Sequence, residues 1–261
     1  MIELREAGVT VPSGEHDTVI LQPTTLSLTE HRISIIGGNG SGKSTLARLC
    51  NGLIEATTGS VTVSAGPEQA PLDTTRHGAA ARRLVGFVFS DPSAQLIMPT
   101  VIEDVALSLR REHRKKAERL DAARAVLERF GIAHLADRSV HTLSGGQRQL
   151  LAFASVLACD PAILVADEPT TLLDLRNARM IDDLLLSLTQ QVLVVTHDLE
   201  LAARADRTLV IDDARVVFDG QPAEAIAFYR DLAARVASEV SSEDRRSARN
   251  GASGGAVGSS S

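Results

Sequence analysis

The segment that most constrains this chain is a glycine-rich run that follows an apolar strand pattern. Residues 37–44 read GGNGSGKS, which fits the pattern G-x-x-x-x-G-K-[ST], and the run RISII at residues 32–36 precedes them. Glycines let backbone N–H groups converge on an anion, and the start of a following helix adds positive potential. The sequence therefore predicts a phosphate-binding loop between a strand and a helix, built from Gly37, Gly38, Asn39, Gly40, Ser41, Gly42, Lys43, Ser44 and Thr45.

Two later segments carry residues that suit nucleotide hydrolysis. In the loop itself, we expect Lys43 to reach the β- and γ-phosphates and Ser44 to hold Mg²⁺ through its hydroxyl. An apolar run at residues 162–166 ends in two acids, of which Asp167 is placed to hold Mg²⁺ through water and Glu168 to polarise the attacking water. His197 follows the next apolar run, and at the carboxyl end of a parallel strand it can face the γ-phosphate.

The pattern of apolar runs predicts an α/β fold with a parallel sheet. The runs at residues 32–36, 162–166, 192–196 and 208–211 are continuous, which is typical of strands covered on both faces. Helices are predicted at residues 43–53 and from the capping residue Asp174 to about residue 188. Residues 2–21 instead suggest short, half-exposed strands around a loop at residues 12–16.

The middle of the chain, from about residue 91 to residue 158, is predicted to be mostly helical. Thr100 and Glu103 have the spacing of a capping box, and an amphipathic helix is expected to end at Gly131. The charged side chains at residues 114–119 are interpreted as a solvated face of that helix.

Charge and composition disfavour several classes of protein. The chain carries 27 lysines and arginines against 33 acidic residues, a net charge of −6, and nucleic-acid binding demands a basic surface. Two cysteines, Cys50 and Cys159, fit a reducing compartment and make no metal-ligand pattern. The charged N-terminus is unlike a signal peptide, and the apolar runs are far shorter than the ~20 residues that span a bilayer. We therefore expect a cytoplasmic chain without a nucleic-acid partner, which reaches a membrane only through other subunits.

The order of the motifs GGNGSGKST, LSGGQ, ILVADEP, LLD and THD resembles that of the ATP-binding cassette (ABC) ATPases, over about residues 1–235. The resemblance implies ATP and Mg²⁺ as ligands. It also implies an α/β P-loop NTPase fold, with a RecA-like core, an antiparallel β edge and a helical ABC subdomain. Cassettes of this family pair head to tail, so a second ABC ATPase subunit is implied, identical or related. The signature LSGGQ, with Ser144, Gly145, Gly146 and Gln147, would then contact the γ-phosphate bound by the partner. The segment LLD, which ends at Asp174, would form the D-loop.

The same resemblance sets the expected domain organisation. One ABC ATPase domain is expected over residues 1–237, with its core at about residues 1–86 and 159–237 and its helical lobe at about residues 87–158. Residues 238–261 are rich in serine and glycine, a composition typical of a disordered tail.

The segment VGFVFSDPSAQL at residues 85–96 resembles the Q-loop of energy-coupling factor (ECF) importer ATPases, which usually reads VFQNPDDQ. Its Ser-Asp-Pro sequence is similar to that in the ATPases of biotin importers. These ATPases drive importers of vitamins, cobalt and nickel. In that family the second glutamine, here Gln95, begins a short helix beside the groove that accepts a coupling helix; an exposed loop side chain is the alternative interpretation. The resemblance implies a transmembrane coupling subunit, a substrate-binding membrane subunit and a peripheral position on the inner face of the cell membrane.

Two positions depart from the family pattern. Ser90 stands where the Q-loop usually has glutamine, and serine is too short to reach the metal as glutamine would, although its hydroxyl can still ligate through a water. Val11 stands where an aromatic residue usually stacks on adenine, and no Phe, Tyr or Trp occurs before Phe87. Because stacking on a base is worth ~1–3 kcal/mol, we expect weaker ATP affinity or looser base selectivity.

Two alternatives to an ECF importer stay open at this point. One is the ATPase of an ordinary ABC importer or exporter, against which the segment VFSDPSAQ argues. The other is a soluble, non-transport ABC protein. The spacing of 101 positions from Lys43 to Ser144 leaves no room for the long coiled coil of the chromosome-maintenance relatives, and a single cassette is unlike the two of the translation factors.

Overall fold

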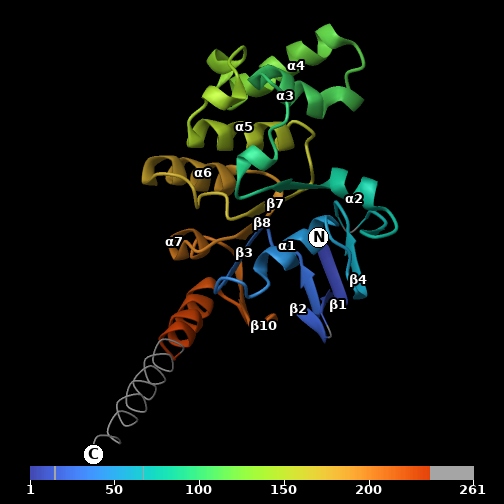
Figure 1. Cartoon of the computed structure of the whole chain (residues 1–261), viewed down its shortest axis with the longest axis vertical. Coiled ribbons are helices and arrows are strands. Elements are labelled where there is room, and N and C mark those ends of the chain that lie inside the picture. The colour runs from blue at the N-terminus through green and yellow to red at the C-terminus, as the bar shows by residue number, and fades with distance from the viewer. Residues whose placement is uncertain (15, 67, 236–261) are drawn as a thin grey trace, which may run out of the picture.

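The structure, a computed structural model, describes residues 1–14, 16–66 and 68–235, and their strands form two sheets (Figure 1). An antiparallel sheet has the order β2-β1-β4-β5, and a six-stranded sheet has the order β10-β9-β3-β8-β7-β6. The second sheet is parallel from β6 to β9, and β10 is antiparallel to β9. The strands are β1 (Ile2–Ser13), β2 (His16–Leu28), β3 (Arg32–Gly37), β4 (Thr58–Val63), β5 (Leu72–Asp73), β6 (Val85–Val88), β7 (Ile163–Asp167), β8 (Gln191–Val195), β9 (Arg207–Asp212) and β10 (Arg215–Gly220).

Helices α3, α4 and α5 gather in a lobe above the sheets in Figure 1, and the helical backbone of residues 222–235 lies at the opposite end. Between β6 and α5 the chain also makes short 3₁₀ turns at Pro92–Ala94, Leu109–Arg111, Ala133–Leu135 and Val140–Thr142. The helices are α1 (Lys43–Asn51), α2 (Gly78–Leu84), α3 (Val101–Ser108), α4 (Lys116–Arg129), α5 (Gly145–Leu157), α6 (Leu175–Ser187) and α7 (Leu199–Ala202).

The four continuous apolar runs form β3, β7, β8 and β9, each within one residue of the predicted bounds. Their side chains are buried because the sheet is covered on both faces, as parallel sheets are. Helix α1 ends at Asn51, where Gly52 adopts a left-handed conformation with φ 71° and its N–H caps the last turn. The predicted parallel α/β core is therefore confirmed.

The N-terminal strands are longer than the sequence pattern suggests. β1 has 12 residues and β2 has 13, and β1 pairs with β2 on one side and β4 on the other. Only the half of each strand near Ile2 and Leu28 packs on the core, while the half near Val11 and Val19 stays exposed. The sequence pattern at residues 2–21 reached β1 and only the outer part of β2, and it missed the inner half of β2. The predicted loop at residues 12–16 is shorter in the structure, because β1 runs to Ser13 and β2 starts at His16.

The helical lobe has an apolar core of its own, to which α3, α4 and α5 contribute Val101, Val105, Leu127 and Leu151. The predicted end of α4 is confirmed, since Gly131 has a φ of 71° just beyond it. The predicted capping box at Thr100 does not form. The Thr100 hydroxyl instead donates to Glu103 Oε2 at 2.6 Å, so it does not accept a backbone N–H of α3.

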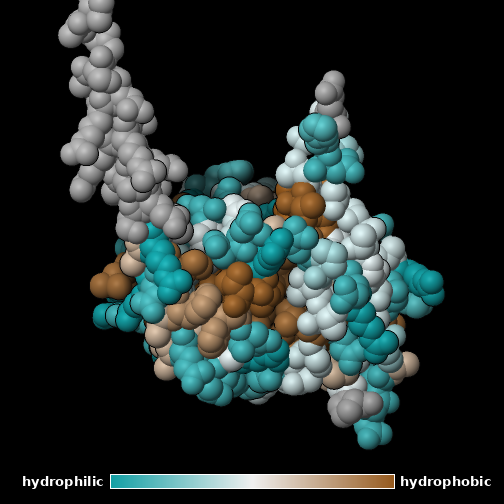
Figure 2. Space-filling model, turned by 90° about the horizontal axis from the view of Figure 1, so that it is seen from below, coloured by the Kyte–Doolittle hydropathy of each residue, from teal (hydrophilic) through white to brown (hydrophobic). Residues whose placement is uncertain are grey.

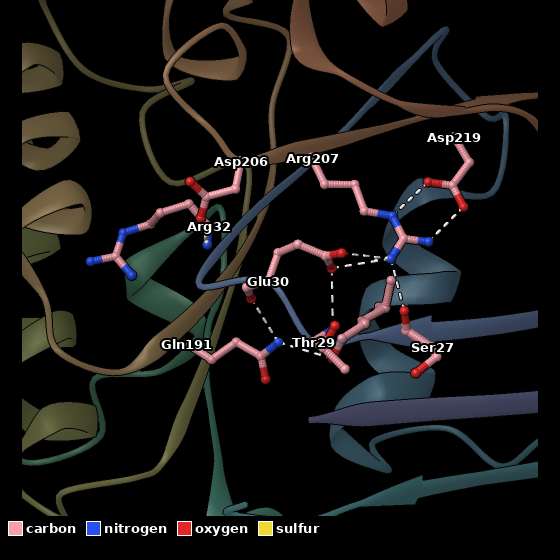
Figure 3. A network of polar contacts seen from close by, with 9 residues as sticks. Ser27, Thr29, Glu30, Arg32, Gln191, Asp206, Arg207 and Asp219 are labelled. Carbon is pink, nitrogen blue, oxygen red and sulfur yellow. Dashed lines mark hydrogen bonds and ion pairs between the residues drawn. The ribbon is translucent and has the colours of Figure 1, made fainter.

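An ion-pair network joins the two sheets where the parallel strands begin (Figure 3). The guanidinium of Arg207, on β9, binds Asp219 through two nitrogens at 2.6 Å, and its third nitrogen binds Glu30 at 3.1 Å and the Ser27 carbonyl at 2.8 Å. Ser27 lies on β2 and Glu30 follows it, so Arg207 ties the antiparallel sheet to the parallel one. These carboxylates raise the pKa of Arg207.

Two other residues at strand starts extend this network. The amide of Gln191, on β8, donates to the carbonyls of Leu28 and Glu30 at 3.0 and 2.9 Å. The backbone N–H of Arg32, on β3, donates to the carboxylate of Asp206 at 2.8 Å. We call the end of the parallel sheet where β3, β8 and β9 begin the amino edge; it carries Arg32, Gln191, Arg207 and the partners of these residues.

The face seen from below in Figure 1 gathers apolar residues at its middle (Figure 2). The elements at that end, β1, β2, β10 and residues 222–235, leave four large apolar side chains exposed, namely Val11, Val19, Val217 and Phe228. Within the described ranges, no helix is both long enough and apolar enough to cross a bilayer. The predicted tail at residues 238–261 lies outside the described residues, and the predicted domain boundaries stay predictions.

Candidate nucleotide site

The phosphate-binding loop connects β3 to α1 and leaves little room for side chains. A Cβ on Gly37, whose φ is 151°, would lie 2.0 Å from the Ile211 carbonyl oxygen of β9, so glycine is required there. Lys43, at the first turn of α1, donates to the carbonyls of Gly37 and Gly38 at 3.0 and 2.7 Å. Burial lowers the pKa of Lys43, and the charges of Glu168 and Asp167 oppose that shift. The loop thus carries a buried cation at the start of a helix, where phosphate oxygens are stabilised.

The end of β7 brings Asp167 to this loop. Its Oδ1 accepts the Ser44 hydroxyl at 2.8 Å, and its Oδ2 lies 3.7 Å from the Arg48 guanidinium. Asp167 is 3% exposed, so the contact is largely shielded from water. A carboxylate and a hydroxyl that meet in this way are the hard oxygen ligands that Mg²⁺ prefers. The residues present therefore fit the ion that the sequence predicts.

Glu168 follows Asp167 in a strained backbone conformation. Its φ is 51°, which is uncommon for a residue other than glycine, and its backbone N–H donates to the Val195 carbonyl at the end of β8. His197 comes from the loop after β8, and its Nε2 lies 3.0 Å from Glu168 Oε1. Thr171 donates to the other carboxylate oxygen at 3.0 Å. The two predicted catalytic residues therefore meet at the carboxyl edge of the sheet, beside Asp167.

The signature lies at the start of α5, in the helical lobe. Ser144 caps the helix: its hydroxyl accepts the Gln147 backbone N–H at 3.3 Å, and the Gln147 side chain accepts the Ser144 N–H at 3.0 Å. Helix α5 therefore has a capping box at Ser144, whereas α3 lacks the one predicted at Thr100. A Cβ on Gly146 would lie 2.5 Å from the Asn177 side chain, so Gly146 is packed against α6.

The predicted D-loop residue, Asp174, is joined to the signature through that asparagine. Asp174 caps α6, because its carboxylate accepts the Asn177 backbone N–H at 2.9 Å and the Asn177 side-chain amide at 2.9 Å. Asn177 in turn fills the space beside Gly146. Asn177 belongs to none of the predicted motifs, and its only signal in the sequence is its place three residues after a capping aspartate.

The Q-loop segment differs from the expectation in one respect. A 3₁₀ turn at Pro92–Ala94 precedes Gln95, so Gln95 ends a turn and does not begin a helix. Its side chain is half-buried and not a free loop residue: Oε1 accepts the Phe89 N–H at 3.3 Å, and Nε2 donates to the Ala152 carbonyl of α5 at 3.4 Å. Gln95 thus joins the end of β6 to the helical lobe. Ser90 is exposed just after β6, and its part in metal binding stays a prediction.

The pocket beside the phosphate-binding loop has one aliphatic side chain in its lining. A pocket of about 300 Å³ at the phosphate-binding loop is lined by Ile20 and by residues from Gly40 to Thr45. Val11 is 41% exposed on β1 and does not line that pocket, so its contact with adenine stays a prediction. Ile20 was not predicted, because one apolar residue in a strand pattern does not indicate a ligand contact.

Comparison with known proteins assigns the chain to a family. A model of the ABC transporter family matches residues 21–171. The chain is 45% identical to the biotin transport ATP-binding protein BioM of Rhizobium etli over 233 residues, which is 89% of this chain and 99% of that protein. It is 41% identical to BioM of Rhodobacter capsulatus, over 81% of this chain and 88% of that protein.

Solved structures support the fold and the chemistry. The ATP-binding cassette MJ0796, in a dimeric post-hydrolysis state with ADP and Pi, superposes with a TM-score of 0.74 at 31% identity, over 85% of this chain and 99% of that one. CbiO1 from Clostridium perfringens, part of the ABC transporter complex cbiONQ, superposes with a TM-score of 0.72 at 30% identity, over 87% and 90% of the two chains. The chain therefore belongs to the ABC transporter family, as an ATP-binding and ATP-hydrolysing subunit.

Proposed function

We propose that this subunit powers an ECF-type importer of the biotin class. The observation that carries the proposal is the likeness to two biotin transport ATP-binding proteins over most of both chains. The segment VFSDPSAQ and the likeness to a subunit of the cbiONQ complex support the ECF type in particular. Import of cobalt or nickel is the second candidate, because the ECF ATPases that the segment VFSDPSAQ resembles also drive importers of these metals.

The geometry of the site supports a separate role in ATP hydrolysis for each predicted residue. Ser44 and Asp167 would hold Mg²⁺, which supplies charge to offset that of the phosphates. Glu168 lies beside Asp167 with its backbone fixed to β8, which suits a group that orients and polarises a water in line with the γ-phosphate. His197, whose Nε2 lies 3.0 Å from Glu168 Oε1, would sense that phosphate. Lys43 would exchange its two carbonyl partners for phosphate oxygens.

A second cassette would complete the site. In this chain the signature lies in the helical lobe, where Gly146 packs against Asn177 of α6. Lys43 of α1 and Asp167 of β7 lie in the core (Figure 1). A head-to-tail pair would bring Ser144, Gly145 and Gly146 of one copy to the γ-phosphate held by the other, so that ATP becomes part of the interface. ATP binding would then close the pair, and hydrolysis would release it. Dimeric cassettes among the relatives support this arrangement.

A groove of about 250 Å³ beside Gln95 suits a coupling helix of a transmembrane subunit. Ser155 of α5 and Gly86 of β6 line it, so it lies between the core and the helical lobe. Ile97, also on the groove, is 71% exposed and offers an apolar contact. Docking there would hold the subunit on the inner face of the cell membrane and bring it near a substrate-binding membrane subunit. Movement at the groove would reach β6 through the Gln95–Phe89 hydrogen bond.

The test is recovery of the intact complex from solubilised membranes. We expect the tagged chain to co-purify with a small coupling subunit and a small substrate-binding membrane protein, and labelled biotin to enter reconstituted vesicles only with ATP inside. Gln95→Ala should reduce recovery at least tenfold. Gln190→Ala is the matched control, since Gln190 is likewise half-buried and hydrogen-bonded, to Asp160 at 3.2 Å. Recovery of a complex without membrane proteins would refute the proposal, and uptake of cobalt or nickel alone would replace biotin as the cargo.

A further inference from the structure

A strongly basic segment connects α3 to α4 in a chain that is acidic overall. Residues 110–119 contain six lysines and arginines and two glutamates, a net charge of +4, whereas the whole chain has a net charge of −6. Sequence alone suggests a solvated helix face, but the segment begins before α4 and includes the turn at Leu109–Arg111. Neither the nucleotide site nor the signature uses it.

Most of this charge is not neutralised within the chain. Lys115 pairs with Glu118 at 2.9 Å, and the Arg119 guanidinium binds the His113 carbonyl at 3.1 Å. The other four side chains are exposed and have no ion-pair partner in the described part of the chain; they are Arg110, Arg111, Arg114 and Lys116. We call these four side chains the basic rim. Holding four like charges together is unfavourable unless anions approach them.

The basic rim borders the groove beside Gln95. Leu107 and Ser108, the last residues of α3, line that groove together with Arg82 and Arg83 of α2. Cys159 also lines it; burial raises the pKa of its thiol, and the charges of Glu112 and Arg111 act on that thiol from the basic segment. Positive charge therefore stands on two sides of the groove, from α2 and from the α3–α4 connection.

We propose that the basic rim binds the anionic headgroups of a lipid bilayer. The inference rests on the proposed function in one respect, namely that the groove faces the membrane. Cytoplasmic loops of membrane proteins carry an excess of lysine and arginine, so a membrane subunit would on average repel this rim. The cytoplasmic leaflet is negative and attracts basic segments at its surface. The rim would thus orient the subunit with its groove towards the bilayer before and during docking.

Vesicle binding by the purified full chain tests this proposal. We compare vesicles of phosphatidylcholine with vesicles that contain 30% phosphatidylglycerol, at low and at high salt. The wild type should partition onto the anionic vesicles alone, and high salt should release it because screening weakens such contacts. Each charge near the surface is worth about fivefold in binding, so the variant with all four rim residues changed to Gln should lose at least tenfold.

A matched variant separates the rim from net charge. Four exposed arginines elsewhere, Arg76, Arg124, Arg138 and Arg230, are changed to Gln, which alters net charge by the same amount. This control should keep most of the binding, and both variants should keep wild-type ATP hydrolysis.

Equal loss in the two variants, or wild-type binding to neutral vesicles, would overturn the proposal. So would a rim variant that binds vesicles normally but fails to recover the membrane subunits in detergent, because the rim would then contact protein. A failed pull-down with intact vesicle binding would count against the importer and leave the lipid contact standing.

Discussion

The two edges of the parallel sheet use charge in opposite ways. At the amino edge, where β3, β8 and β9 begin, Arg207 binds two carboxylates and a carbonyl, and its pKa is raised. At the carboxyl edge, Lys43 is buried with a lowered pKa, and Glu168 is held at a φ of 51°. Charges that satisfy one another hold a fold together, whereas strained or poorly paired charges are kept where a ligand supplies the missing partner.

Close to the carboxyl edge, the charge of one acid also acts on a second, buried acid. Asp182 of α6 is 7% exposed, and its Oδ1 has no hydrogen-bond partner among the described residues. Burial and the charge of Asp198, which caps α7 directly after His197, raise the pKa of Asp182 to about 6, while Arg204 opposes the shift. The carboxyl edge thus tolerates a repulsion that the amino edge avoids.

The largest expected effect separates chemistry from folding at the carboxyl edge. Glu168→Gln should lower ATP turnover about 10²- to 10⁴-fold, because the amide cannot polarise water as a carboxylate does. ATP binding and thermal stability should stay near wild type. Steady-state phosphate release and nucleotide titration check this, with Glu200→Gln as an exposed glutamate control. Near-normal turnover in Glu168→Gln would remove this residue from the catalytic role.

The next effect tests the amino edge. Arg207→Met should lower the free energy of unfolding by about 2–4 kcal/mol, since it leaves Glu30 and Asp219 without their cation at a site only 19% exposed. Turnover per folded molecule should be unchanged. Arg204→Met is the control, because its pair with Asp183 is exposed on both sides and should contribute little. Equal losses in urea titrations of the two variants would deny the amino edge its stabilising role.

A smaller effect depends on pH. The folded chain raises the pKa of Asp182 to about 6 from an ordinary value of 3.8, so it binds this proton more readily than the unfolded chain does. Stability from this residue therefore falls as pH rises from about 4 to 6, and ionised Asp182 is unfavourable at neutral pH. Asp182→Asn should stabilise the fold by about 1–3 kcal/mol at pH 7.5 and by nothing at pH 4. A gain that is the same at both pH values would contradict this.

The smallest effect concerns the predicted contact between adenine and Val11 on β1. Val11→Tyr should tighten ATP binding about threefold to tenfold, since a ring that stacks on adenine adds a contact that valine lacks. The same change should sharpen the preference for ATP over GTP. Asp17→Tyr, on the neighbouring strand and the other face, serves as the control. If the two tyrosines act alike, Val11 is not next to the base.

The sequence predicted the carboxyl edge better than the amino edge for a physical reason. The contact between Ser44 and Asp167 joins residues 123 apart, yet both stand in motifs whose spacing is set by the phosphates they serve. Arg207 and Glu30 are 177 residues apart and no motif connects them, so each resembles an ordinary charged residue beside a strand. The contact between Asn177 and Gly146 was not predicted either, because no motif connects the two residues. Continuous apolar runs located β3, β7, β8 and β9, whereas the inner half of β2 was not predicted, because its sequence QPTTLSL is mostly polar.

The central claim is that the amino edge holds the fold and the carboxyl edge binds the nucleotide, independently of each other. The most direct test is the rise in melting temperature that saturating ATP and Mg²⁺ produce. At about 100 times the dissociation constant, ATP should stabilise the wild type by ~2.7 kcal/mol, or roughly 5–10 °C. We predict the full rise in Arg207→Met, on a lower baseline, and no rise in Lys43→Ala, on a baseline close to wild type. Loss of the rise in Arg207→Met, or its survival in Lys43→Ala, would contradict the claim.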